Sequence, residues 1–75
     1  MNCRLVRVYK EESLEHIYSI KPRTMFAVYH ERKPYVCTLE YDEVRGYYFQ
    51  GYMKEYEKRT FSFKEAQKIY RLISH

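Results

Sequence analysis

Two neighbouring segments rich in β-branched and aromatic residues constrain this fold more than any other feature of the chain. Residues 24–30 read TMFAVYH and residues 35–41 read YVCTLEY, with only the polar stretch ERKP (31–34) between them. A short polar break between two segments of this kind predicts a β-hairpin. We therefore expect an antiparallel sheet at the centre of the molecule.

Further strands are expected on both sides of this hairpin. Residues 3–9 are apolar with interspersed arginines, a composition that suits a strand. Residues 42–46 are expected to form a polar turn ending on a glycine, followed by a strand over 47–54. Residues 11–16 interrupt the strand pattern and predict a helical turn or an irregular excursion. Residues 17–20 either extend that excursion or form a short strand.

The C-terminal region has the pattern of an amphipathic helix. Ser62 and Glu65 have the spacing of a capping box, in which two side chains bind each other's backbone N–H groups. Apolar residues then recur at helical spacing, namely Ala66, Ile69, Tyr70 and Ile73. We therefore expect residues 1–75 to form a single small α+β domain. In it, a small antiparallel β-sheet of three to four strands carries one C-terminal amphipathic helix packed on one face.

Five of the ten tyrosines cluster in the middle of the chain, which contains no tryptophan. They are Tyr41, Tyr47, Tyr48, Tyr52 and Tyr56. Alternate residues of a strand point to opposite faces of a sheet. The more apolar set within 47–54 is expected to face the core beside Cys37 and Leu39. That set consists of Tyr47, Phe49, Gly51 and Met53.

The other set is expected on a sheet face that stays partly open to solvent. It consists of Tyr48, Gln50, Tyr52, Lys54 and Tyr56. Thr38 and Glu40 are the expected neighbours on this face, and Arg45 and Arg59 are the expected contacts at its rim. We expect this surface to bind a partner.

Three alternatives for the tyrosines stay open at this point. An amphipathic ring can cover an exposed sheet without any binding role, because tyrosine is a favoured strand residue. Residues 10–20 can fold over the same face. A helix over 52–59 would also place Tyr52 and Tyr56 one turn apart.

A protein partner is the first functional expectation. Tyr, Met and Arg are enriched at protein interfaces, and tyrosine provides a large contact area for little lost side-chain entropy. Acidic residues lie among the tyrosines and would repel phosphates, namely Glu40, Asp42, Glu43, Glu55 and Glu57. We expect a stand-alone, non-enzymatic protein that inhibits or modulates a larger protein or nucleoprotein complex, as small proteins of phages and mobile elements often do. Self-association as a homodimer through the exposed face is also expected.

A module that binds single-stranded nucleic acid is the alternative function. The same tyrosines would stack on bases, and lysine and arginine side chains would contact the backbone. The net charge of +4 permits this partner without requiring it. A second candidate basic patch lies on the expected helix and consists of Lys64, Lys68 and Arg71.

Catalysis is the weakest of the three functional classes. The chain has no Gly-rich phosphate loop and no HExxH or nucleophile motif, so we expect no enzyme, no cofactor and no metal site. A zinc site made from Cys3, His16, His30 and Cys37 would match no common ligand spacing, and His75 ends the chain. No apolar run reaches about 18 residues, and the N-terminus lacks the apolar block of a signal peptide. A cytoplasmic location is therefore expected.

Overall fold

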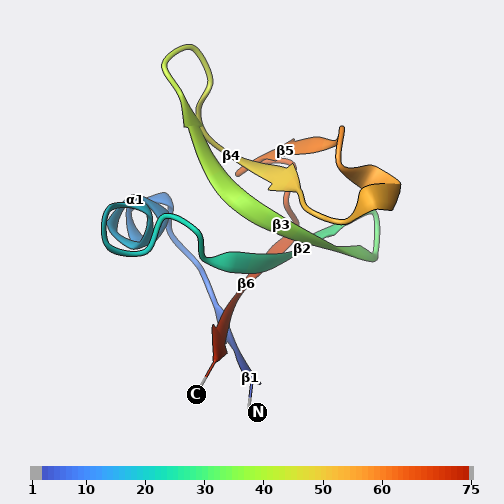
Figure 1. Ribbon diagram of the computed structural model, residues 1–75, viewed down its shortest axis with the longest axis horizontal. Coiled ribbons are helices and arrows are strands. Elements are labelled where there is room, and N and C mark those ends of the chain that lie inside the picture. The colour runs from blue at the N-terminus through green and yellow to red at the C-terminus, as the bar shows by residue number, and fades with distance from the viewer. Residues whose placement is uncertain (1–2, 75) are drawn as a thin grey trace.

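The computed structural model describes residues 3–74, which form a six-stranded antiparallel sheet and one short α-helix (Figure 1). The strands are β1 (Cys3–Arg7), β2 (Met25–His30), β3 (Lys33–Asp42), β4 (Gly46–Gly51), β5 (Thr60–Ser62) and β6 (Lys68–Ser74). Helix α1 spans Glu11–Ile20, and a single 3-10 turn, η1, spans Lys54–Tyr56. The strand order across the sheet is β1-β6-β2-β3-β4-β5.

The predicted C-terminal helix is wrong, because this segment forms strand β6 between β1 and β2. The capping box does form: the Ser62 N–H donates to Glu65 Oε1 at 3.0 Å, and the Glu65 N–H donates to Ser62 Oγ at 3.1 Å. It stabilises only a turn, however. The sequence KIYRLIS of β6 is rich in β-branched and aromatic residues. As a strand it satisfies the backbone groups of two neighbouring strands, which a helix would leave unpaired.

The predicted hairpin is confirmed as β2 and β3, whose register pairs Phe26 with Cys37. Strands β1 and β4 also lie within the segments 3–9 and 47–54 to within one residue, although β4 ends at Gly51. The predicted count of three to four strands is wrong because β5 and β6 were not expected. Strand β5 has only three residues. The segment of β6 also fits a helix, and its strand partners, β1 and β2, are distant along the chain.

Helix α1 packs on the core face of the sheet. Leu14 and Ile17 are buried there, and with Tyr18 they follow the i, i+3, i+4 spacing of one helix face. The Tyr18 ring meets the Tyr47 ring edge-on, with centroids 5.4 Å apart. Residues 10–20 therefore do not fold over the face that carries Tyr48.

The sheet curls around its core face. Phe61 of the edge strand β5 lies 5.2 Å from the His30 ring and 4.9 Å from the Tyr35 ring, measured between centroids. Strand β5 pairs with β4, so contacts reaching β2 and β3 require a strongly bent sheet. Phe26 and Phe49 fill the concave side and are almost completely buried. The convex side is the outer face, and the helix does not cover it.

Cys37 belongs to this core, and its burial raises the pKa of the thiol to about 11. At pH 8 we expect it to react with a disulfide reagent about 100-fold more slowly in the folded than in the unfolded protein, because the thiolate fraction falls by about that factor. A Cys3→Ser variant leaves a single thiol, whose reaction rate is then measured with and without denaturant. Equal rates in the two states would show that Cys37 is accessible.

Candidate binding face

The outer face of β3 and β4 carries the centre of the predicted binding surface. The register places Gln50 beside Thr38 and Tyr48 beside Glu40. These are the neighbours expected from the alternation of side chains, and all four residues are half-buried. The opposite side of the same strands pairs Phe49 with Leu39 on the core face. The assignment of the two faces is therefore confirmed within β4, whereas Met53, predicted on the core face, lies beyond the strand and is exposed.

Tyr52 extends this surface by one residue beyond β4. Its N–H donates to the Val36 carbonyl oxygen at 2.9 Å, which continues the strand ladder. The side chain is 61 % exposed and lines a groove of about 540 Å³. The groove is lined by Tyr18, Pro22, Arg23, Met25, Thr38, Glu40 and Tyr52.

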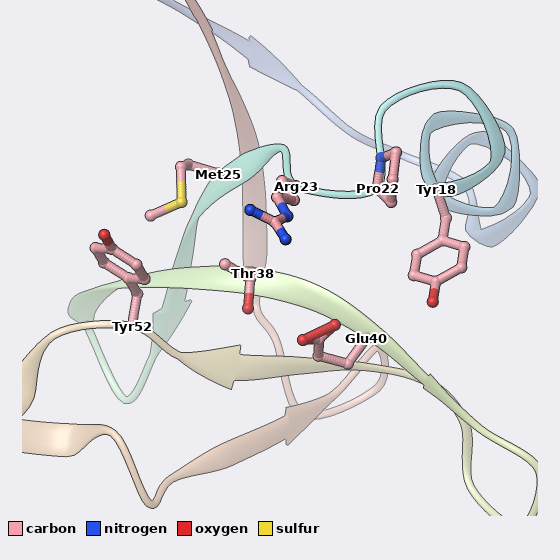
Figure 2. Close-up of a pocket in the computed structure, with 7 residues that line it drawn as sticks. All are labelled: Tyr18, Pro22, Arg23, Met25, Thr38, Glu40 and Tyr52. Atoms are coloured by element: carbon pink, nitrogen blue, oxygen red, sulfur yellow. The ribbon is translucent and has the colours of Figure 1, made fainter.

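The groove exists because β2 is shorter than β3. Strand β2 begins at Met25, opposite Thr38, whereas β3 continues to Asp42. The connection 21–24 passes this part of β3 without pairing to it. Figure 2 shows the Arg23 guanidinium above β3, with Met25 and Tyr52 on one side and Pro22 and Tyr18 on the other.

Sequence reasoning missed the contribution of the α1–β2 connection and of the first residue of β2 to this site. Arg23 and Met25 reach the groove only because β2 starts late and α1 lies on the other face of the sheet. No periodic pattern or motif marks them. The X-Pro sequence at 21–22 indicates a connection, but it does not indicate which strand the connection passes.

Tyr56 and Lys54 are not on the outer face, because the chain turns back after Gly51 through η1. The Tyr56 hydroxyl oxygen accepts the Val36 N–H at 2.8 Å, and its ring meets Tyr35 edge-on at 5.0 Å. The Tyr56 hydroxyl thus accepts the hydrogen bond from β3 that a backbone carbonyl oxygen would accept if β4 were longer. Its position indicates a structural role, and Lys54 is exposed on η1. The helix considered for residues 52–59 is limited to the single turn η1.

Arg45 lies at the rim of the outer face, against the Tyr48 ring. Its guanidinium carbon is 4.0 Å from the centroid of the Tyr48 ring, and its Nη1 donates to Thr60 Oγ1 at 3.4 Å. Asp42 Oδ1 accepts the N–H groups of Val44 at 2.7 Å and Arg45 at 3.2 Å, which lowers the pKa of Asp42. This ordered turn fixes the arginine over Tyr48, so part of that ring is already covered.

Arg59 occupies a different place from the one expected. Its guanidinium carbon is 4.9 Å from the Tyr35 ring centroid and 5.2 Å from that of Phe61, and its Nη1 donates to the Tyr35 hydroxyl at 2.9 Å. Both rings belong to the concave side. Arg59 therefore lies at the end of the core and not at the rim of the outer face.

The second candidate basic patch is divided by the fold. Lys64 lies in the turn after β5, and Lys68 pairs with Tyr29 on the outer face. Arg71 pairs with Phe26 on the core side, and its buried Nε has no hydrogen-bond partner among residues 3–74. These three side chains do not form one surface, because alternate residues of β6 point to opposite faces.

Histidines and cysteines do not converge in the part of the chain that the structure describes. Within it, no group of three or more His, Cys, Asp or Glu residues is placed to hold a metal ion. His30 packs against Phe61, and His16 is exposed on α1. The side chain of Cys3 and the whole of His75 lie outside the described part.

Comparisons with known proteins leave the fold and the groove as the basis for a functional conclusion. No family model, no curated protein and no solved structure matches this chain. Over residues 3–74, no helix has both the length and the apolar character needed to span a membrane. The strand topology and the burial of the side chains show a small antiparallel-sheet domain with a few exposed tyrosines.

Proposed function

We propose that this protein is a non-enzymatic binding protein that attaches to a larger protein through the outer face of β3 and β4 and the adjacent groove, and thereby inhibits or modulates it. The observation that carries the proposal is the exposed Tyr52 beside Met25 and Arg23 at the groove. Tyrosine and arginine are the residue types most often found at interface hot spots, and methionine is enriched at interfaces.

The charges around the groove favour a protein over a nucleic acid. Arg23 and Glu40 both line it, and Arg45 and Asp42 lie at the neighbouring hairpin turn. Glu40 and Asp42 would repel a phosphate backbone, whereas a protein surface can offer complementary groups of both signs. The proposal assumes the cytoplasmic location that the sequence predicts.

Replacing Tyr52 with alanine tests this proposal. We expect the affinity for the partner to fall about 30-fold or more, the effect of removing a hot-spot residue. The folded state should be nearly unaffected, because substitutions of exposed residues usually change stability by less than about 0.5 kcal/mol. The measurement is affinity capture from nuclease-treated lysate of the source cells, followed by binding assays with the purified partner.

Tyr41→Ala is the matched control, because Tyr41 is 52 % exposed but belongs to the core-face set of β3, beside Tyr47. The proposal requires that a protein is still captured after nuclease treatment, and that it binds the wild type and Tyr41→Ala but not Tyr52→Ala. A dimer that dissociates only in Tyr52→Ala would identify a second copy of the chain as the partner. Equal binding by all three proteins, or loss of capture after nuclease, would contradict the proposal.

A further inference from the structure

The other half of the outer face, over β1, β6 and β2, carries a continuous row of aromatic and guanidinium groups. The guanidinium carbon of Arg7 is 5.2 Å from the centroid of the Tyr9 ring and 6.0 Å from that of Tyr70. The Tyr70 ring in turn meets the Tyr29 ring edge-on at 5.8 Å. The register confirms that Tyr70 lies between Arg7 of β1 and Ala27 of β2 on this face.

Two hollows adjoin this row of side chains, and both are lined by Gln67 and Lys68. Tyr29 and Arg32 complete the lining of the larger one, which has a volume of about 230 Å³. The smaller one, about 150 Å³, lies at the end of β1, where Arg7 and Tyr9 meet Val8, Phe63, Ala66 and Ile69 from the core side. Each hollow thus combines one tyrosine with one arginine, and neither is lined by an acidic residue.

The fold partly segregates charges that alternate along the sequence. Neither β1 nor β6 contains an acidic residue. Of their four basic residues, Arg7 and Lys68 lie on the outer face, whereas Arg4 and Arg71 are on the core side. The acidic residues of the chain lie in α1, in β3 and in the connections between strands, and of these Glu31 is next to Arg32 in the β2–β3 turn. Because β1 and β6 come together from the two ends of the chain, this basic region is not visible as a run in the sequence.

The β2–β3 turn supplies Arg32 at a conformational cost. It has two residues, Glu31 with φ 51° and Arg32 with φ 69°. Two-residue turns with positive φ strongly favour asparagine and glycine, because other residues are strained there. Strain of this kind is characteristic of ligand-binding positions. In this turn it accompanies the placement of Arg32 at the same hollow as Tyr29.

We propose that this surface, called here the basic–aromatic patch, binds single-stranded nucleic acid. The patch consists of Arg7, Tyr9, Tyr29, Arg32, Lys68 and Tyr70. Unpaired bases stack on the tyrosines of the two hollows, and the three basic side chains contact the phosphates between them. A duplex is disfavoured because its bases are already stacked and hide their faces. The patch is separate from the groove at Tyr52, so the two proposals stand or fall independently.

Binding of a labelled 12-nucleotide oligothymidylate, followed by fluorescence anisotropy at 25–300 mM NaCl, tests the proposal. We expect tighter binding than to a 12-base-pair duplex, and a slope of log K against log[salt] of about −2, the value for three phosphate contacts on a single strand. Tyr9→Ala should weaken binding about tenfold, because base stacking on an aromatic ring has roughly that effect. Tyr41→Ala is its control and should bind like the wild type.

Two triple variants separate specific contacts from overall charge, since each removes three positive charges from the net +4. The patch variant is Arg7→Gln, Arg32→Gln and Lys68→Gln. The control, made at exposed lysines outside the patch, is Lys21→Gln, Lys54→Gln and Lys58→Gln. Only the patch variant should lose binding.

Arg32→Gly gives a readout that misfolding cannot imitate. It should raise the Tm by about 4 °C, because glycine adopts positive φ without strain. It should also weaken binding and make the salt slope less steep by about 0.7, the contribution of one phosphate contact. Equal losses of oligothymidylate binding in the two triple variants would overturn the proposal, as would duplex binding as tight as single-strand binding. Equally effective competition from polyglutamate would also overturn it, because it would indicate an acidic protein as the occupant.

Discussion

Replacing Gly51 with alanine is expected to destabilise the protein by about 3 kcal/mol, the upper range of the effect of overpacking. In a domain of this size that corresponds to a fall in Tm of about 12 °C or more. The added Cβ would overlap the carbonyl oxygen of Tyr56 and would lie 2.9 Å from Cδ2 of the Tyr56 ring. Because the nearest atom, the carbonyl oxygen, belongs to the backbone, a rotation of the Tyr56 side chain cannot relieve the clash.

The loop that follows Gly51 cannot easily move away from an added methyl group. The Gly51 N–H donates to the Arg59 carbonyl oxygen at 2.9 Å, and the Gln50 side chain donates to the carbonyl of Glu57. The Tyr56 hydroxyl is bound to the Val36 N–H at 2.8 Å. Displacing the loop would break these hydrogen bonds and shift Tyr52. We therefore expect a lower free energy of unfolding and an altered shape of the groove that Tyr52 lines.

Gly46→Ala is the matched control for this prediction. Gly46 has a φ of 77°, but a Cβ there would have no described neighbour within 4 Å apart from the adjacent residues. We expect it to lose only about 1–2 kcal/mol, from the left-handed conformation alone. Thermal unfolding followed by circular dichroism compares the two variants. If Gly51→Ala is no less stable than Gly46→Ala, then Tyr56 does not approach Gly51 as closely as the structure shows.

Leu14→Ala is expected to destabilise the protein by about 2–5 kcal/mol, the range for truncation of a buried leucine. Leu14 is fully buried and attaches α1 to the core that contains Phe26 and Phe49. A 75-residue chain has a small core, so its total stability is expected near the lower end of about 5–15 kcal/mol. One such cavity should therefore leave a measurable unfolded fraction at 37 °C.

Glu15→Ala provides the control on the same helix, because Glu15 is exposed. It should change the free energy of unfolding by less than about 0.5 kcal/mol. Urea unfolding followed by circular dichroism gives both values. Similar midpoints for the two variants would mean that α1 is not docked on the sheet, and that residues 11–20 contribute little to the core.

The centre of the fold was predictable because its signals are local. The hairpin of β2 and β3 follows from two strand-like segments and a short polar break. The two faces of β4 follow from alternation, which places Phe49 inward and Tyr48 outward. That same argument failed after Gly51, because the hydrogen bonds that turn the chain back involve Arg59 and Val36. Tyr56 was consequently assigned to the wrong face, and Lys54 lies on η1 beyond the strand.

Both candidate binding surfaces depend on neighbours that are distant in sequence. Arg23 joins Tyr52 at the groove, and Tyr9 joins Tyr29 around Lys68. The sequence shows acidic and basic residues close together almost everywhere, which argued against a nucleic-acid partner. Pairing of the first strand with the last brings Arg7 beside Tyr70 on one face, a neighbourhood that the sequence does not show.

The sequence by itself determined the central strands and the residues that face their core, because alternation along a strand is a property of adjacent residues. Only the tertiary structure decided the state of the C-terminal segment. Its apolar residues fit a helix as Ala66, Ile69, Tyr70 and Ile73, but the same segment also alternates as a strand with Ile69 buried. The strand prevails because β1 and β2 each have an edge that only an extended chain can satisfy, and the free energy of those backbone hydrogen bonds cannot be read from the segment alone.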